Sequence, residues 1–175
     1  MCEIVYHITN LESALNIWKT KEYIPANCWG DRGLNCFIKD VKYNGMNSIP
    51  RDGVEVYFRW YGEIVRESCE KDIDNYIPNL LIDMQPWRAI ISAPIEEKDK
   101  SLELISFDFY DCDDQLDLFL RKKFVYKYIC LTKNLKNKYK KSFKESINRD
   151  LRKQHCFISI RDLTKERKNE QHSPT

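Results

Sequence analysis

The sequence predicts a single domain of the α+β class, with a sheet of short strands and helices packed on it. Residues 3–8 alternate in polarity and lead at once into an amphipathic helical pattern. Three further segments, 54–60, 87–92 and 102–109, have the composition of strands. A last amphipathic helix precedes the end of the chain, and 175 residues suit one domain.

The first predicted unit is a strand followed by a helix. Residues 3–8 are rich in β-branched and aromatic side chains, and Asn10 is a favourable N-cap for a helix that begins at Leu11. Four apolar residues recur at the spacing of one helix face: Leu11, Ala14, Leu15 and Trp18. Pro25 ends the unit.

The middle of the chain is expected to alternate loops with short elements. Residues 26–53 hold four of the five glycines and are expected to be loop-rich. The strand 54–60 closes at Tyr61-Gly62, and a short helix is expected at 63–74. The strands 87–92 and 102–109 follow.

The second half opens with an acidic turn that contains Asp113 and Asp114. Short strands are expected after it, at 117–120 and at 126–131. A further strand is expected at 156–160.

A helix is predicted between these strands. Ser142 and Glu145 have the spacing of a capping box, which places the start of the helix at Ser142. Phe143, Ile147 and Leu151 then form an apolar face with a four-residue repeat. The polar residues 161–175 are expected to form a flexible basic tail.

Composition limits the cellular compartments in which the protein is expected to work. The seven cysteines are scattered and none forms a C-x-x-C pair, so free thiols in a reducing cytosol are expected rather than a structural zinc. No apolar run approaches the ~20 residues of a membrane span. The N-terminus lacks the basic and apolar regions of a secretory signal. A cytoplasmic protein without a membrane partner is expected.

The net charge of +2 is the sum of two unequal parts. Residues 132–175 carry 13 Lys and Arg against 5 Asp and Glu, whereas residues 1–131 carry 16 against 22. A basic C-terminal region favours nucleic acid or an acidic protein as partner. A solvated surface explains the same charges without any partner.

The segment Ile4-Val5-Tyr6-His7-Ile8-Thr9-Asn10-Leu11, followed by its apolar helix, resembles the opening of the DarT family. These toxins ADP-ribosylate DNA, and the resemblance implies that His7, Thr9 and Asn10 bind the nicotinamide side of NAD. Imidazole, hydroxyl and amide groups suit a carboxamide, which offers both a donor and an acceptor. The alternative is that His7 and Thr9 are ordinary strand residues and that Asn10 only caps the helix.

Two arginines are candidates for the NAD phosphates. Residues 50–58 are similar to the family's segment in which a loop leads into a strand, and this implies a catalytic-site role for Arg51 on the pyrophosphate. A guanidinium matches phosphate oxygens two at a time. Arg32 is the second candidate, because the nearby Gly30 and Gly33 let the backbone approach a ligand. The alternative for either arginine is a surface charge.

The third resemblance lies in Leu116-Asp117-Leu118-Phe119-Leu120, followed by Val125-Tyr126-Lys127-Tyr128-Ile129. In the family an acidic residue opens such an apolar strand, so Asp117 stands at the position of the catalytic carboxylate. Its implied task is to bond the ribose hydroxyls and stabilise an oxocarbenium ion. The family has Glu there. Asp reaches about 1.5 Å less far, and a ~1 Å misplacement can cost about 100-fold. Alternatively, Asp117 lies on the exposed face of an edge strand.

Together the resemblances span residues 3–131 with gaps and imply an ADP-ribosyltransferase-like domain over residues 1–160. The implied sheet is split and strongly bent, with mixed or antiparallel strands. The implied function is NAD-dependent transfer of ADP-ribose to a macromolecule, with nucleic acid favoured over protein. The alternative is an inactive module that recognises NAD, ADP-ribose, nucleic acid or a partner protein. A third possibility is a nucleic-acid-binding domain that uses only the basic end.

Other chemistries have less support. The sequence has no P-loop and no G-x-S-x-G motif, and its three histidines are far apart. The acidic residues between Asp108 and Asp117 lack the spacing of a calcium loop, so no metal is expected. The aromatic residues around Arg59 suit base stacking, although a strand buries half of them: Tyr57, Phe58, Trp60 and Tyr61.

Overall fold

Buried and partly exposed residues alternate along two strands of the sheet. In the strand β4 (Gly53–Trp60), Val54, Val56 and Phe58 are buried, and the residues between them are partly exposed. Because successive side chains of a strand point to opposite faces, one face of β4 belongs to the core. The same alternation is present in β3 (Gly33–Ile38), which lies within the segment expected to be loop-rich.

The computed structural model describes residues 2–25, 33–41, 53–62, 87–110, 112–129 and 132–161. Its elements follow one another in this order: β1 (Glu3–Thr9), α1 (Leu11–Thr20), β2 (Glu22–Tyr23), β3, β4, β5 (Arg88–Ser92), the 3₁₀ turn η1 (Glu97–Asp99), β6 (Leu102–Tyr110), α3 (Asp113–Leu120), the π-helical turn η2 (Val125–Ile129), α4 (Lys133–Lys153), β7 (Cys156–Phe157) and β8 (Ser159–Ile160).

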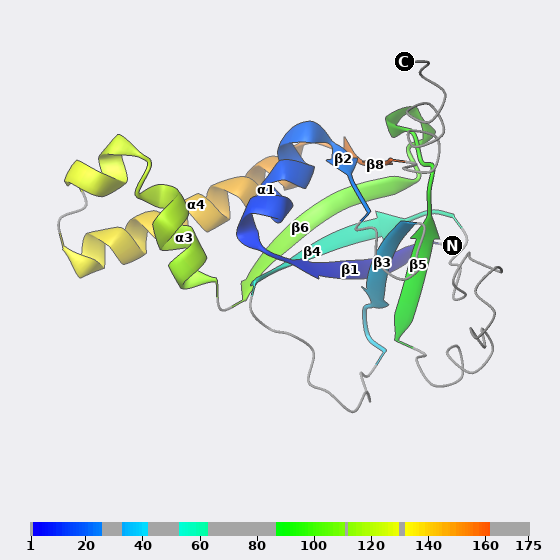
Figure 1. Ribbon diagram of the computed structural model, residues 1–175, viewed down its shortest axis with the longest axis horizontal. Coiled ribbons are helices and arrows are strands. Elements are labelled where there is room, and N and C mark those ends of the chain that lie inside the picture. The colour runs from blue at the N-terminus through cyan, green and yellow to red at the C-terminus, as the bar shows by residue number, and fades with distance from the viewer. Residues whose placement is uncertain are drawn as a thin grey trace, which may run out of the picture.

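The main sheet has six strands in the order β5-β3-β1-β4-β6-β7, and every neighbouring pair is antiparallel. The helices α1 and α4 cover one face of this sheet (Figure 1). A second sheet has two parallel strands, β2 and β8. The described residues therefore form a mixed α and β fold with a mostly antiparallel sheet, as the sequence predicts.

The sheet bends sharply between β1 and β3. β1 pairs with β4 along its whole length, from Glu3 to Thr9, but pairs with β3 only at Val5↔Ile38 and Tyr6↔Phe37. Beyond Tyr6, β3 no longer pairs with β1, while its other edge pairs with β5 from Gly33 to Phe37. Figure 1 shows β3 and β5 crossing the direction of β1 at a steep angle. This separation opens the sheet next to His7.

The first helix confirms its prediction. The Oδ1 atom of Asn10 accepts a hydrogen bond from the backbone N–H of Ser13 at 2.8 Å, so Asn10 is the N-cap. The buried face of α1 contains Leu11, Ala14 and Leu15, while Trp18 is only partly buried. The helix ends at Lys21, whose φ of 60° is left-handed.

Two strands predicted in the second half are wrong. Residues 117–120 belong to the helix α3, and Val125–Ile129 form the π-helical turn η2; residues 130 and 131 lie outside the described part. The helix buries Leu116 and Leu120, four positions apart on one face. Asp113 and Asp114 in its first turn favour a helix, because they lie at the positive end of its dipole.

The last helix starts earlier than the capping box predicts. α4 begins at Lys133, where the hydroxyl of Thr132 accepts from the backbone N–H of Leu135 at 3.3 Å. Ile147 and Leu151 are buried against the sheet, as expected. Asn148 fixes the helix on β6, because its side-chain amide both donates to and accepts from the backbone of Phe107, each at 2.8 Å.

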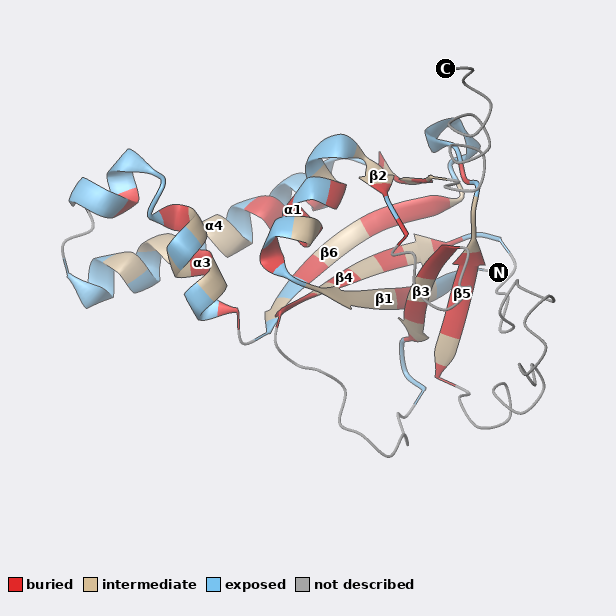
Figure 2. Cartoon of the chain, viewed as in Figure 1, coloured by how far each residue is buried: buried red, intermediate tan, exposed pale blue. Residues whose placement is uncertain are grey.

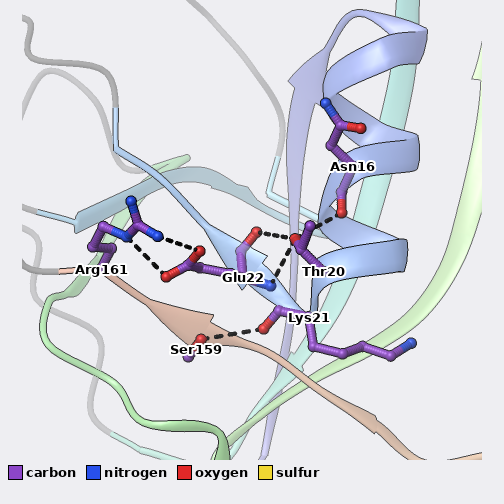
Figure 3. Close-up of polar contacts among 6 residues, drawn as sticks. All are labelled: Asn16, Thr20, Lys21, Glu22, Ser159 and Arg161. Atoms are coloured by element: carbon purple, nitrogen blue, oxygen red, sulfur yellow. Dashed lines mark hydrogen bonds and ion pairs between the residues drawn. The ribbon is translucent and has the colours of Figure 1, made fainter.

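The strand expected at 156–160 is two strands in different sheets. β7 pairs with β6, and β8 pairs in parallel with β2. Figure 3 shows the contacts that close this second sheet. Arg161 donates to both carboxylate oxygens of Glu22, at 2.9 and 2.8 Å, and the hydroxyl of Ser159 donates to the carbonyl of Lys21 at 3.2 Å.

The core lies between the sheet and the helices, and Figure 2 shows the buried residues gathered there. The far end of α3, η2 and the start of α4 project beyond the sheet and are largely exposed. Among the described helices, none is long and apolar enough to cross a membrane. The helix expected at 63–74 and residues 162–175 of the expected tail lie outside the described residues.

Candidate functional site

A cavity of about 330 Å³ lies where β1 and β3 separate. Its lining comes from three strands and from the residue before β5: His7, Ile8, Asn35, Cys36, Phe37, Trp87 and Arg88. The sequence singled out only His7 among them. The cavity is a direct result of the short β1–β3 ladder, because the two strands no longer close on each other there.

His7 is the most constrained polar group of this cavity. Its Nδ1 atom lies 2.8 Å from the backbone carbonyl oxygen of Asn35, and its ring packs edge-on against Tyr23 at 5.3 Å between centroids. Burial lowers the pKa of His7 below its ordinary value, and the bond to Asn35 offsets this only in part. The imidazole is therefore neutral at pH 7.

This bond also fixes the tautomer of His7. A carbonyl oxygen can only accept, so the proton of the neutral ring lies on Nδ1. The Nε2 atom then carries a lone pair and acts as an acceptor. A ligand that reaches Nε2 must bring an N–H or O–H group.

Asn35 connects His7 to a positive charge. The Nε–H of Arg88 donates to the side-chain oxygen of Asn35 at 3.1 Å, while the backbone oxygen of Asn35 bonds His7. Phe37 and Trp87 add aromatic surface to the lining. The cavity therefore offers an acceptor, a guanidinium and flat apolar walls, which suit a planar ring with an attached anionic group.

Cys36 lines the same cavity but is not a nucleophile. Its side chain is buried, and this burial raises the pKa of the thiol well above its ordinary range. A protonated thiol is a poor nucleophile and a poor metal ligand. The four described cysteines are free thiols: Cys2, Cys36, Cys112 and Cys156.

Thr9 and Asn10 lie further along the chain. Thr9 is the last residue of β1 and pairs with Val54. Asn10 uses its side-chain oxygen as the helix cap. Neither residue lines the cavity at His7.

Asn10 lies instead in a groove of about 380 Å³ between α1 and α3. Leu11, Leu15, Leu118 and Phe119 give this groove its apolar lining. The backbone N–H of Leu11 donates to the side chain of Gln115 at 2.8 Å. The structure thus brings together two segments that carry the resemblance, one around Asn10 and the other around Gln115.

Asp117 points to α4. Its carboxylate accepts hydrogen bonds from the hydroxyl of Tyr126 and from Nζ of Lys140, the latter at 2.7 Å. Partial burial works against ionisation, but the bonds from Lys140 and Tyr126 outweigh it and hold the pKa of Asp117 below its ordinary value. Asp117 lines neither the cavity at His7 nor the groove at Asn10.

Among the described residues, one carboxylate is buried, and the sequence analysis did not single it out. Glu103 is 5% exposed. Its carboxylate forms an ion pair with Arg59 at 2.8 Å and lies 2.5 Å from Nδ1 of His155. Arg59 and Glu103 are directly opposite each other on β4 and β6. The predicted strands placed both residues in one sheet, but pairing them requires the register, which the sequence does not supply.

Two of the four aromatic residues around Arg59 belong to the core. Phe58 and Trp60 are buried in the core, as the alternation of a strand predicts. Tyr57 stacks on Tyr6 at 5.3 Å between centroids and donates to Glu55.

Arg32 and Arg51 lie outside the described residues, so their roles stay predictions. Within the described ranges, no three or more His, Cys, Asp or Glu side chains are grouped to hold a metal ion. Comparisons with protein-family models, curated proteins and solved structures found no match.

Proposed function

We propose that the protein binds NAD or ADP-ribose in the cavity at His7, as a module of the ADP-ribosyltransferase type. The observation that carries this proposal is the opening of the sheet between β1 and β3, with His7 and Arg88 in its lining. The resemblance supports the proposal, because it implies that His7 binds the nicotinamide side of NAD.

The chemistry of the cavity matches parts of this ligand. The Nε2 acceptor of His7 suits the amide N–H of nicotinamide or a ribose hydroxyl. Phe37 and Trp87 suit the flat face of a ring, and Arg88 suits a phosphate oxygen. The ligand exceeds a cavity of about 330 Å³, so we place its nicotinamide–ribose part here and leave the remainder outside.

Recognition without turnover has the better support. Among the described residues that line the cavity there is no carboxylate. Asp117 is already bonded to Lys140 and Tyr126. An oxocarbenium ion needs a nearby negative charge, and the described lining of the cavity does not provide one.

Transfer of ADP-ribose is the second candidate. The contact between Leu11 and Gln115 favours it, because it joins the N-terminal segment to the helix that carries Asp117.

The first prediction concerns binding at His7. Isothermal titration with NAD, ADP-ribose and nicotinamide is expected to show binding to the wild type, and His7→Ala is expected to weaken NAD binding about tenfold through the lost hydrogen bond. His155→Gln is the matched control, because that histidine bonds Glu103 outside the cavity. Equal affinities of wild type and His7→Ala would contradict the proposal.

A measurement of NAD turnover distinguishes the binding module from the transferase. Nicotinamide release and label transfer from NAD to an oligonucleotide or to protein are measured for the wild type and for Asp117→Ala. Binding without release supports the module. Release that is lost in Asp117→Ala establishes the transferase.

A further inference from the structure

A basic surface with exposed aromatic rings lies at the projecting end of the molecule. We call it the basic tip and define it by the cations of η2, of the turn before it and of the first turn of α4, together with two rings, Phe124 and Tyr128. The cations are Arg121, Lys122, Lys123, Lys127, Lys133 and Lys136. In Figure 1 this end lies far from β3 and β5, and Figure 2 shows it largely exposed.

The charge of this region is unusually one-sided. Residues 118–144 contain ten Lys and Arg and no Asp or Glu. Lys140 and Lys144 are neutralised by Asp117 and Asp113, at 2.7 and 2.9 Å. None of the six cations of the basic tip forms an ion pair with a described residue, so their charge is available to a polyanion.

The two rings are exposed and close together. Phe124 is 69% exposed and Tyr128 is 54% exposed, and their centroids are 4.9 Å apart with 38° between the planes. The Nζ atom of Lys127 lies 5.0 Å from the centre of the Tyr128 ring. Large exposed rings beside cations are the two components of a surface that stacks bases and contacts phosphates.

A buried residue holds the rings in place. Tyr126 lies between them in sequence and is 1% exposed. Its hydroxyl bonds Asp117 on α3, and its ring packs against Tyr139 on α4 at 5.7 Å between centroids. The turn that carries Phe124 and Tyr128 is therefore anchored to two helices, so a ligand need not order it.

We propose that the basic tip binds single-stranded nucleic acid, with bases stacked on Phe124 and Tyr128 and phosphates on the surrounding cations. A single strand is favoured over a duplex because its bases have free faces. A membrane surface fits less well. Insertion requires a continuous apolar face, whereas a cation lies against the rings here, with Nζ of Lys127 5.0 Å from the centre of the Tyr128 ring. This proposal does not rest on NAD binding.

Fluorescence anisotropy tests the proposed binding of nucleic acid at the basic tip. The two probes are a labelled oligothymidylate of about 16 nucleotides and a labelled duplex of the same length, and NAD is left out of the assay. We expect tighter binding of the single strand, with affinity falling between about 50 and 200 mM salt. Replacing Lys122, Lys123 and Lys127 by Gln is expected to reduce the salt slope by about 2. The control is Lys98→Gln with Lys100→Gln, two exposed lysines at η1.

The rings are tested by the double substitution Phe124→Leu and Tyr128→Leu. Leucine keeps the apolar surface but removes the stacking face, so single-strand affinity is expected to fall about tenfold or more. The rings are exposed, so this variant is expected to fold, and circular dichroism checks it. Unchanged affinity in this variant overturns the proposal.

Three other results also overturn it. The first is equal affinity for the duplex and the single strand. The second is binding to vesicles of anionic lipid but not to nucleic acid, with the vesicle binding unchanged by the leucine substitutions. The third is self-association through the tip, seen in sedimentation, without nucleic-acid binding. Because NAD is absent from the assay, failure here leaves the NAD proposal standing. Likewise, the result of the His7→Ala experiment does not bear on nucleic-acid binding at the basic tip.

Discussion

His7 shows at the residue scale how burial and a single hydrogen bond define a functional group. The ring is held by the backbone of Asn35 and by packing against Tyr23. Burial makes it neutral, and the carbonyl of Asn35 fixes its proton on Nδ1. One acceptor atom, Nε2, remains for a ligand.

The lowered pKa of His7 predicts a pH dependence of stability. Below about pH 6.5 the unfolded chain binds a proton that the folded chain excludes, so unfolding is favoured. The contribution of neutral His7 is complete above this pH and is lost as the pH falls towards the lowered folded pKa. Urea unfolding at about pH 7.5 and pH 5.5 measures it.

His7→Gln provides the comparison for this experiment. Glutamine does not titrate, so its free energy of unfolding is expected to fall less between the two pH values than that of the wild type. Equal pH dependence of the two proteins would show that another group is responsible.

Single residues were predictable where their role is local. Asn10 caps α1, because a cap depends only on the next few residues of the chain. Asn35 and Arg88 were missed, because their bond joins residues 53 positions apart and depends on the β3–β5 register. Asp117 was placed on a strand because Leu118 to Leu120 is a short apolar run, which periodicity alone cannot assign.

At the scale of elements, the strand β4 depends on a glycine at its start. Gly53 has a φ of 153°, and a Cβ atom there would lie 2.4 Å from the backbone oxygen of Thr9. Its position opposite the end of β1 therefore excludes any side chain.

Gly53→Ala is expected to lower the free energy of unfolding by about 2 kcal/mol, because the backbone must shift or strain. Thermal and urea unfolding measure this loss. Asn16→Ala, on the exposed side of α1, is the control and is expected to be near neutral. A Gly53→Ala protein as stable as the wild type would mean that the β1–β4 ladder tolerates displacement at this end.

Helix starts show why element boundaries were only partly predictable. Ser142 and Glu145 have the spacing of a capping box, yet both lie inside α4. The true cap is Thr132, followed by a lysine-rich first turn. The apolar residues, such as Ile147, correctly predicted which face of α4 packs on the core. The same pattern does not indicate where the helix begins.

At the scale of the whole molecule, the ladders predict an order of stability. β1 and β4 lie inside the main sheet and pair along seven residues. β2 and β8 pair through only two residues at the margin of the fold. Amide hydrogen exchange is expected to be slowest in β1 and β4 and fastest in β2 and β8. Equal protection of the two sheets would indicate that the fold opens only as one unit.

The α+β character was predictable from the whole chain, because strand composition and helical periodicity are both properties of short local segments. Four strands of the main sheet, β1, β4, β5 and β6, were located closely. The bend and the cavity were not derivable from these patterns. They depend on where β3 leaves β1 after Tyr6, and that is a property of two strands together.

The pairing of β2 with β8 has a consequence for protein synthesis. Glu22 and Arg161 are 139 positions apart, and a chain leaves the ribosome with its N-terminal residues first. β2 must therefore emerge long before its partner strand exists. Until then the backbone groups of β2 that pair with β8 stay open to water. The second sheet can close only when nearly all of the described chain has been translated.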